Sequence, residues 1–324
     1  MILKGIHHVS AHTANATDNY DFYTRILGMR LVKKTVNQDS PSMYHLFYAD
    51  EVGNPGTDLT FFEIPMLAKT HKGTNSISDT SLRVPTDEAL EYWQKRFDKY
   101  DVKRGEITER AGHQILRFED PEGQRLTLIS DEKDNGVEAG TPWDKSSVPA
   151  EYGITGLGPV RLTVSNEAAT AGILKEILGY KQTRSYASDE ADQPDILVFE
   201  TGEGGNGSEI HLEERRDLPV ERPGRGSAHH VAFRIETEEE MHHWVEHIKA
   251  ARLPNSGFVD RYYFRSLYFK EPNGILFELA TDGPGFATDE DVDHLGESLA
   301  LPPFLEEKRE EIEQSLTPLD TKSK

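Results

Sequence analysis

One order of secondary-structure segments occurs four times along this chain, and this repeat constrains the fold more than any other feature. In the first copy, a strand pattern over residues 5–13 precedes a helical pattern over 15–27. Three more strand patterns follow at 29–37, 43–50 and 58–64. A supersecondary unit that recurs at regular spacing predicts a chain built from equivalent modules.

The other three copies keep this order. Their first strands, helices and last strands are predicted at 76–84, 87–100 and 125–130, at 156–164, 167–178 and 208–213, and at 228–235, 237–251 and 275–280. A tight turn with Pro second and Gly fourth precedes the last strand of copies two and four, at 120–123 and 271–274. We therefore expect an α+β protein of four βαβββ modules.

The predicted division of the chain follows from the composition of its connections. The stretch 131–151 is rich in Gly, Ser and Pro, as interdomain linkers are. We expect an N-terminal pair of modules over 1–145, a C-terminal pair over 146–285, and an acidic tail over 286–324. The tail has a helical pattern at 303–316, whose charges most simply form a solvated face.

Charge and cysteine content exclude several classes of function. The net charge of −21 repels phosphate backbones and anionic lipid, so we expect neither nucleic acid nor a membrane as a partner. With no cysteine, a metal can be held only by His, Asp or Glu. The chain starts without a charged leader and apolar segment, so we expect a cytoplasmic protein. A homo-oligomer stays open as an assembly.

The first and last strands of each module should each present one side chain to the concave face of the sheet. In module one these are His8 and Asp58, 50 residues apart, and in module four His230 and Glu278, 48 apart. The corresponding pairs in modules two and three are Thr80 with Thr127 and Pro159 with Glu209.

The pairing of modules decides whether these side chains form a site. Sequential pairing would separate the two histidines. Pairing module one with module four instead brings His8, His230 and Glu278 together with Asp58 nearby, and leaves a second, empty cup between modules two and three. We favour the second arrangement, because two imidazoles and one carboxylate bind Fe(II) or a similar ion and leave positions open for small ligands.

The histidine pairs at 7–8 and 229–230 occupy equivalent positions of two modules, which favours a metal site over simple packing. By contrast, we expect His45, His113 and His211 to be structural. On an ideal strand, His7 and His229 would point away from their neighbours.

These residues resemble the vicinal oxygen chelate superfamily of glyoxalases, extradiol dioxygenases and bleomycin-resistance proteins. The resemblance rests on the His-His-Val of the first strand and on the Glu-Pro-Asn-Gly-x-x-x-Glu-Leu ending at Leu279. Over nearly its whole length, the chain resembles the ring-cleaving hydroquinone dioxygenases of bacterial quinone resistance. Further segments that carry this resemblance are 55–62, 226–233 and 295–297.

The resemblance implies Fe(II) held by His8, His230 and Glu278, with Mn(II), Ni(II) or Zn(II) as other possible ions. It implies cleavage of a hydroquinone- or catechol-type ring with O2, in the detoxification of quinones or other aromatic compounds. It also assigns catalytic or substrate-binding neighbours, namely Tyr268, His229, His7, Arg261 and Ser10.

Two alternatives stay open. If Asp58 supplies a fourth ligand, the site resembles that of a glyoxalase-like isomerase or lyase using Ni or Zn as a Lewis acid. A cup that only sequesters a toxic ligand is the other alternative, although the complete metal triad disfavours it.

Overall fold

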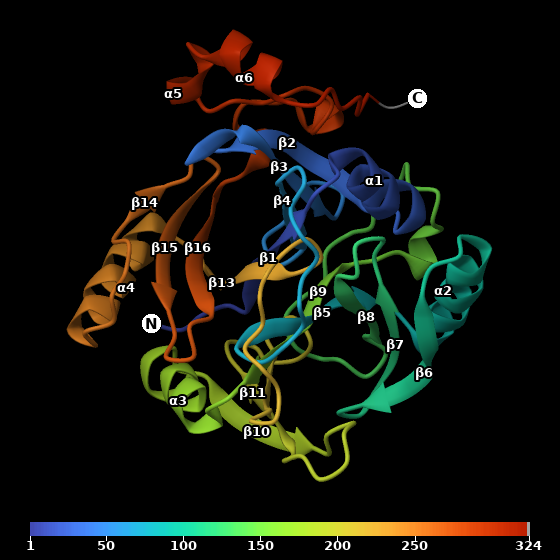
Figure 1. Ribbon diagram of the computed structural model, residues 1–324, viewed down its shortest axis with the longest axis vertical. Coiled ribbons are helices and arrows are strands. Elements are labelled where there is room, and N and C mark those ends of the chain that lie inside the picture. The colour runs from blue at the N-terminus through green and yellow to red at the C-terminus, as the bar shows by residue number, and fades with distance from the viewer. Residues whose placement is uncertain (323–324) are drawn as a thin grey trace.

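Two curled eight-stranded sheets make up most of the protein, as seen in a computed structural model that describes residues 1–322 (Figure 1). The first sheet has the order β14-β15-β16-β13-β1-β4-β3-β2 and the second β10-β11-β12-β9-β5-β8-β7-β6. The fold class is thus confirmed: four βαβββ modules, with module one sharing a sheet with module four.

The strands of the first sheet are β1 (Ile6–Thr13), β2 (Arg30–Asn37), β3 (Ser40–Ala49), β4 (Asp58–Glu63), β13 (Ala228–Ile235), β14 (Val259–Asp260), β15 (Phe264–Lys270) and β16 (Leu276–Pro284). Those of the second are β5 (Ser76–Val84), β6 (Arg104–Arg110), β7 (His113–Glu119), β8 (Arg125–Ser130), β9 (Gly156–Val164), β10 (Lys181–Tyr186), β11 (Ile196–Glu200) and β12 (Ile210–Glu214).

Antiparallel pairs at the centre of each sheet join the modules: β1 with β13 in the first sheet, and β5 with β9 in the second. Each sheet therefore combines one module from each half of the chain. The division of the chain into units 1–145, 146–285 and 286–324 stays a prediction.

The four module helices lie on the outside of the sheets (Figure 1). They are α1 (Ala16–Tyr20), which continues as a π-helical segment (Asp21–Ile26), α2 (Asp87–Lys99), α3 (Glu167–Gly172), which continues as a π-helical segment (Ile173–Ile177), and α4 (Glu238–Ala250). Thr86 and Thr237 begin α2 and α4 by accepting a hydrogen bond from the backbone at the third position, a common N-cap. No helix within residues 1–322 is both long and apolar enough to cross a membrane.

Consecutive modules pack through their helices and turns instead of their sheets. The Arg96 guanidinium of α2 donates to the carbonyl of Ile26 at 2.8 Å, and the Tyr23 hydroxyl donates to Asp120 at 3.1 Å. In the second half, His247 of α4 contacts the carbonyl of Ile177 at 3.0 Å. The chain thus places modules one and two side by side while each completes a sheet with a distant partner.

The register of the second sheet corrects two sequence-based expectations. His211, and not Glu209, occupies the position equivalent to Glu278, because His211 pairs with Arg161 as Glu278 pairs with Ala232. The other correction concerns Thr80. Asp79, and not Thr80, lines the cavity of this sheet. On β5, Ile77 faces Leu162 while Asp79 faces Arg161, so Ser78 is an extra residue in the pairing. A shift of one residue turns a strand side chain to the other face, which is why the constant spacing between modules misplaced Thr80.

The C-terminal tail covers the edge of the first sheet, above β2 and β3 in Figure 1. The predicted helix at 303–316 is interrupted, giving α5 (Pro303–Glu306) and α6 (Arg309–Ser315). Lys34 of β2 pairs with Leu299, and fully buried Lys33 forms ion pairs with Asp289, at 2.6 Å, and Glu290. Covering an edge strand in this way protects its unpaired backbone groups from other chains.

We expect Lys33→Ala to destabilise the protein by about 3–5 kcal/mol, because it leaves Asp289 and Glu290 without their buried cation. The matched change Lys4→Ala removes a pair with Glu236 whose side chains are 39% and 50% exposed, and should cost at most about 1 kcal/mol. Urea unfolding of the two variants measures the difference. Equal midpoints would show that the tail is not held by Lys33.

Candidate metal centre

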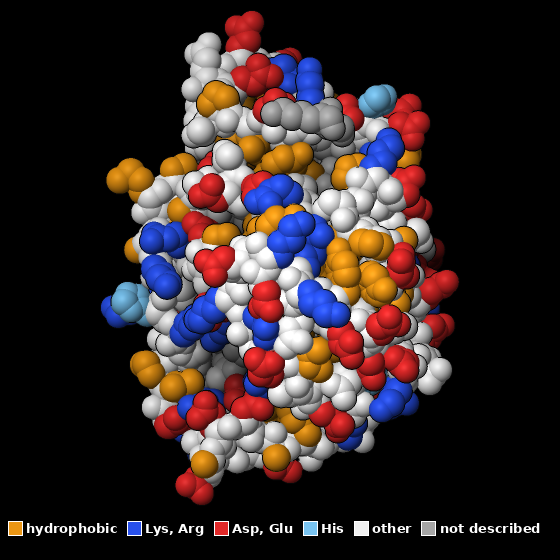
Figure 2. All heavy atoms as spheres, turned by 90° about the vertical axis from the view of Figure 1, so that its right-hand side faces the viewer, with side chains coloured by type: hydrophobic (Ala, Val, Ile, Leu, Met, Phe, Trp, Pro, Cys, Tyr) orange, Lys and Arg blue, Asp and Glu red, His pale blue; other side chains and the backbone are white. Residues whose placement is uncertain are grey.

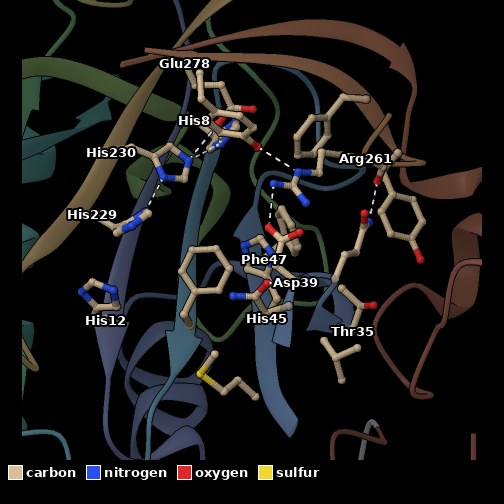
Figure 3. A pocket seen from close by; sticks show the side chains of 18 of the residues that line it. His8, His12, Thr35, Asp39, His45, Phe47, His229, His230, Arg261 and Glu278 are labelled. Carbon is tan, nitrogen blue, oxygen red and sulfur yellow. Dashed lines mark hydrogen bonds and ion pairs between the residues drawn. The ribbon is translucent and has the colours of Figure 1, made fainter. Parts of the chain in front are cut away.

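Three side chains from distant parts of the chain converge on the concave face of the first sheet. His8 comes from β1, His230 from β13 and Glu278 from β16, and one ligand atom of each lies within 4.8 Å of the others. All three are almost fully buried. Figure 3 shows the two imidazoles and the carboxylate pointing toward one another.

The distances between these atoms fit a shared cation. The Nε2 atoms of His8 and His230 are 3.1 Å apart, and Glu278 Oε2 lies 3.1 Å from the first and 2.8 Å from the second. Donors at right angles around an ion, each about 2.1 Å from it, are about 3.0 Å apart. Both carboxylate oxygens of Glu278 are buried without an oriented hydrogen bond, so their lone pairs are available to a metal.

Local irregularities of the β1–β13 pair bring both histidine pairs to the site. Ile6 pairs with Phe233 and His8 pairs with the adjacent Ala232, so His7 is an extra residue in the pairing. On β13, His229 is extra in the same way. Such bulges redirect side chains, and here they turn both rings toward their neighbours, contrary to the expectation for an ideal strand.

Each bulge histidine contacts the ring of the next residue. The Nδ1 atoms of His7 and His8 are 2.9 Å apart, and those of His229 and His230 are 2.8 Å apart. His7 Nε2 lies 3.0 Å from the carbonyl of Thr281, so it must carry the proton. In neutral His7 the Nδ1 lone pair then accepts from His8 Nδ1, which leaves His8 Nε2 with the free lone pair that a metal requires.

Burial keeps both bulge histidines neutral. It lowers the pKa of His7 to about 3, with a further contribution from His8, and lowers the pKa of His229 to about 3 together with His230. Burial alone would raise the pKa of Glu278, but the adjacent His8 and His230 hold it well below its usual value. The centre therefore holds Glu278 as a carboxylate anion, with the Nε2 atoms of His8 and His230 facing it.

The three donors lie at the end of a cavity of about 430 Å³ with largely aromatic walls. A volume of this size is typical of a small-molecule site. Its apolar walls include Phe47, Phe62 and Phe264, and the last packs on the His8 ring with centroids 5.3 Å apart. A flat aromatic ligand placed among them would face the three donors.

Two polar side chains, Tyr268 of β15 and Arg261 just before this strand, line the cavity together with the three donors. Tyr268 lies with its ring 6.0 Å from that of His230, and its hydroxyl accepts a hydrogen bond from Arg261 Nε at 3.2 Å. Asp39, in the turn between β2 and β3, accepts from the other end of this guanidinium at 2.9 Å. Burial raises the pKa of Tyr268, so its hydroxyl keeps the proton that it can donate to a ligand.

Three of the expected residues, His7, Ser10 and Asp58, are outside the cavity lining. Ser10 is fully buried outside the cavity lining, where its hydroxyl contacts that of Thr60 at 2.7 Å. Asp58 is also outside the lining and the three-residue group, and burial with nearby Asp50 raises its pKa well above the usual range. The position of Asp58 gives no support to a fourth ligand.

Sequence reasoning missed two histidines of the cavity. His45, expected to be structural, lies between Phe47 and Phe62 and contacts Thr60 through Nε2 at 2.9 Å. His12 lines the wall next to His229. Strand alternation was the available signal, because His45 and Phe47 are two residues apart and therefore share a face of β3.

We expect the rings of His7 and His229 to stay neutral from pH 8 to pH 5, since their pKa values of about 3 lie below this range. Proton NMR of the ring C–H groups, assigned with His7→Phe and His229→Phe, measures this directly. Constant chemical shifts are the expected result. A midpoint between pH 6 and 7 for either ring would contradict the buried, neutral acceptor that orients its neighbour.

Comparisons with known proteins agree on one family. The profile of the Glyoxalase/Bleomycin resistance protein/Dioxygenase superfamily matches residues 5–128 and 156–279. The chain is 55% identical over 319 residues to a Bacillus subtilis (strain 168) protein named as a ring-cleaving dioxygenase, MhqA, covering 98% of this chain and 100% of that protein.

Two further relatives span almost the whole chain. A chlorohydroquinone/hydroquinone 1,2-dioxygenase of Sphingobium indicum is 29% identical, covering 96% of this chain and 95% of its own. A crystal structure described as a dioxygenase of Bacillus subtilis superposes with a TM-score of 0.89 at 34% identity, covering 100% of this chain and 99% of its own. The chain therefore belongs to the Glyoxalase/Bleomycin resistance protein/Dioxygenase superfamily, in which these relatives are named as dioxygenases.

Proposed function

We propose that this protein is an Fe(II)-dependent dioxygenase that cleaves the ring of hydroquinone-type or catechol-type substrates with O2. The observation that carries the proposal is the convergence of His8, His230 and Glu278 at the end of an aromatic-walled cavity. The names of the relatives support ring cleavage and, in one case, a hydroquinone substrate. A role in the detoxification of quinones or other aromatic compounds is part of the proposal and rests on the family resemblance.

The donor set supports a redox-active ion with open positions. Two imidazoles and one carboxylate are the ligand types of non-haem Fe(II) oxygenases. When bound, Fe(II) would supply a site at which the substrate oxygen and O2 meet. His7 and His229 would hold the two imidazoles in the tautomer that presents Nε2 to the ion, because each offers an Nδ1 acceptor.

The walls of the cavity would orient the ring. Phe47, Phe62 and Phe264 provide apolar faces, and the ring of His45 lies with centroids 4.0 Å from Phe47 and 4.1 Å from Phe62. Aromatic rings favour offset or edge contacts with such walls. The polar partners available to a substrate hydroxyl would include the three donors, Tyr268 and His45.

Tyr268 and Arg261 would act on the oxygen atoms of the substrate. Tyr268 accepts from Arg261, so its own proton points away from that contact and is free to be donated. A general acid at this place would deliver a proton as the O–O bond breaks. Arg261 holds the phenol in position and is itself held by Asp39.

Glu278→Gln and His230→Ala should lose stoichiometric iron and all oxygen uptake, because each removes one of three ligands. Asp58→Asn is the matched control and should keep both, since Asp58 lies outside the group of donors. The proteins are loaded with Fe(II) without oxygen, analysed for metal, and mixed with hydroquinone or catechol at an oxygen electrode.

Two results of that experiment would refute the proposal. One is stoichiometric iron in either ligand variant, and the other is a wild-type enzyme that consumes no oxygen with any tested hydroquinone or catechol. Loss of metal in Asp58→Asn would favour the four-ligand isomerase instead, which uses no oxygen.

Tyr268→Phe should lower kcat by about 100-fold while iron content stays unchanged, because the variant keeps the ring but lacks the proton donor. Tyr262→Phe is the matched control, since Tyr262 is outside the cavity lining. Steady-state oxygen uptake and metal analysis on both variants give the comparison. An unchanged kcat in Tyr268→Phe would remove this residue from the catalytic group.

A further inference from the structure

The second sheet carries a cup that mirrors the metal centre but has different chemistry. Two adjoining cavities, of about 290 and 250 Å³, share Ser78, Arg125 and Arg161 in their linings. The sequence predicted no metal site in this cup, and the structure shows that ionised side chains line it. Across both linings, eight side chains are Lys or Arg and five are Asp or Glu, although acidic residues outnumber basic ones by 57 to 36 in the whole chain.

The strand register relates the two cups residue by residue. In the first sheet, Ala232 of β13 lies between His8 of β1 and Glu278 of β16. In the second, Arg161 of β9 lies between Asp79 of β5 and His211 of β12. The bulge residue before Asp79 is Ser78, as His7 is the bulge residue before His8.

In the second sheet, Arg161 therefore occupies the position that Ala232 occupies between His8 and Glu278 in the first. Ala232 leaves room for an ion between its neighbours, whereas Arg161 fills the equivalent position with a permanent positive charge. Among residues 1–322, no group of three potential metal ligands is found in this second cup.

The donors of this arginine and its neighbour are incompletely satisfied. Arg161 makes one hydrogen bond, to the Tyr186 hydroxyl at 3.3 Å, and lies 3.7 Å from half-exposed Asp189. Arg110 is bound to Asp79 at 2.7 Å. The Nε atoms of both arginines are buried without a partner. Buried cationic donors without partners are costly, and a ligand with oxygen anions would relieve that cost.

Two acidic side chains of the linings have partners other than Arg161 and Arg110. Thr163 donates to Glu213 at 2.6 Å, and Arg117 at the rim binds Asp189 at 2.5 Å. The apolar side chains of Phe118 and Leu126 complete the wall beside Arg110. Figure 2 shows the face of the molecule that carries α2 and β6, on which Lys and Arg side chains gather among acidic ones and the surface is hollowed at the lower left.

We propose that the cup between modules two and three binds a small oxyanion, a carboxylate or a phosphate, between the guanidinium groups of Arg161 and Arg110. The planar fork of arginine matches both groups. The apolar wall of Phe118 and Leu126 favours a carboxylate that carries a short carbon skeleton. This site is separate from the metal centre and does not depend on the proposed reaction.

Isothermal titration calorimetry of the full-length protein with benzoate, and separately with inorganic phosphate, tests the proposal at low ionic strength. Arg161→Gln should weaken binding at least tenfold, because a charge-assisted hydrogen bond contributes that much. Arg117→Gln, at a rim position 42% exposed, should weaken it about two- to fivefold and serves if Arg161→Gln does not fold. Exposed Arg252→Gln, with the same change of charge outside the cup, should have no effect.

Glu278→Gln separates this site from the metal centre, because it should abolish iron binding yet leave benzoate binding unchanged. Preference for benzoate would identify an organic carboxylate as the ligand class, and preference for phosphate the inorganic or phosphorylated class. The proposal is overturned if wild type binds neither probe, if both Arg161→Gln and Arg117→Gln bind as wild type, or if Glu278→Gln removes the binding.

Discussion

The antiparallel pairing of β1 with β13 is the interaction on which the structure of the candidate site depends. It joins the first module to the fourth and brings His8 into contact with His230, 222 residues away along the chain. Backbone hydrogen bonds of such a pair fix the relative position of two strands to within one residue. Because β4 and β16 are each parallel neighbours of these strands, the same pairing also places Glu278 and the aromatic wall of β3.

Within that pair, regular hydrogen bonding is given up at two points. His7 and His229 are extra residues in the ladder, and both rings turn to contact the ring that follows them. The loss of local pairing is offset by ring-to-ring contacts, and at His7 the Thr281 carbonyl fixes the tautomer that orients His8. The use of one device twice, once on each central strand, gives the cup an internal symmetry.

The second sheet has the same topology and the same bulge on its first strand, but its side chains have a different chemistry. Arg161 replaces the small Ala232, and Asp79 and His211 replace the two outer donors. One cup thus offers anionic and neutral ligands to a cation, whereas the other presents cations in a strongly acidic protein. Equivalent backbones can serve opposite charges, because the functional groups lie only in the side chains.

The sequence by itself determined the module pattern and the three candidate donors, since hydrophobic periodicity and repeated histidines are local signals. The chemistry of those donors then predicted the pairing of modules one and four. It could not place Asp79, or the rings of His7 and His229, because bulges change which face a residue occupies and leave no periodic signature. Only tertiary packing decided where the side chains of Ser10 and His45 lie. It buries the Ser10 hydroxyl and exposes the His45 imidazole to the cavity. A spacing defines which strands are equivalent, but the register between distant strands decides which side chains meet.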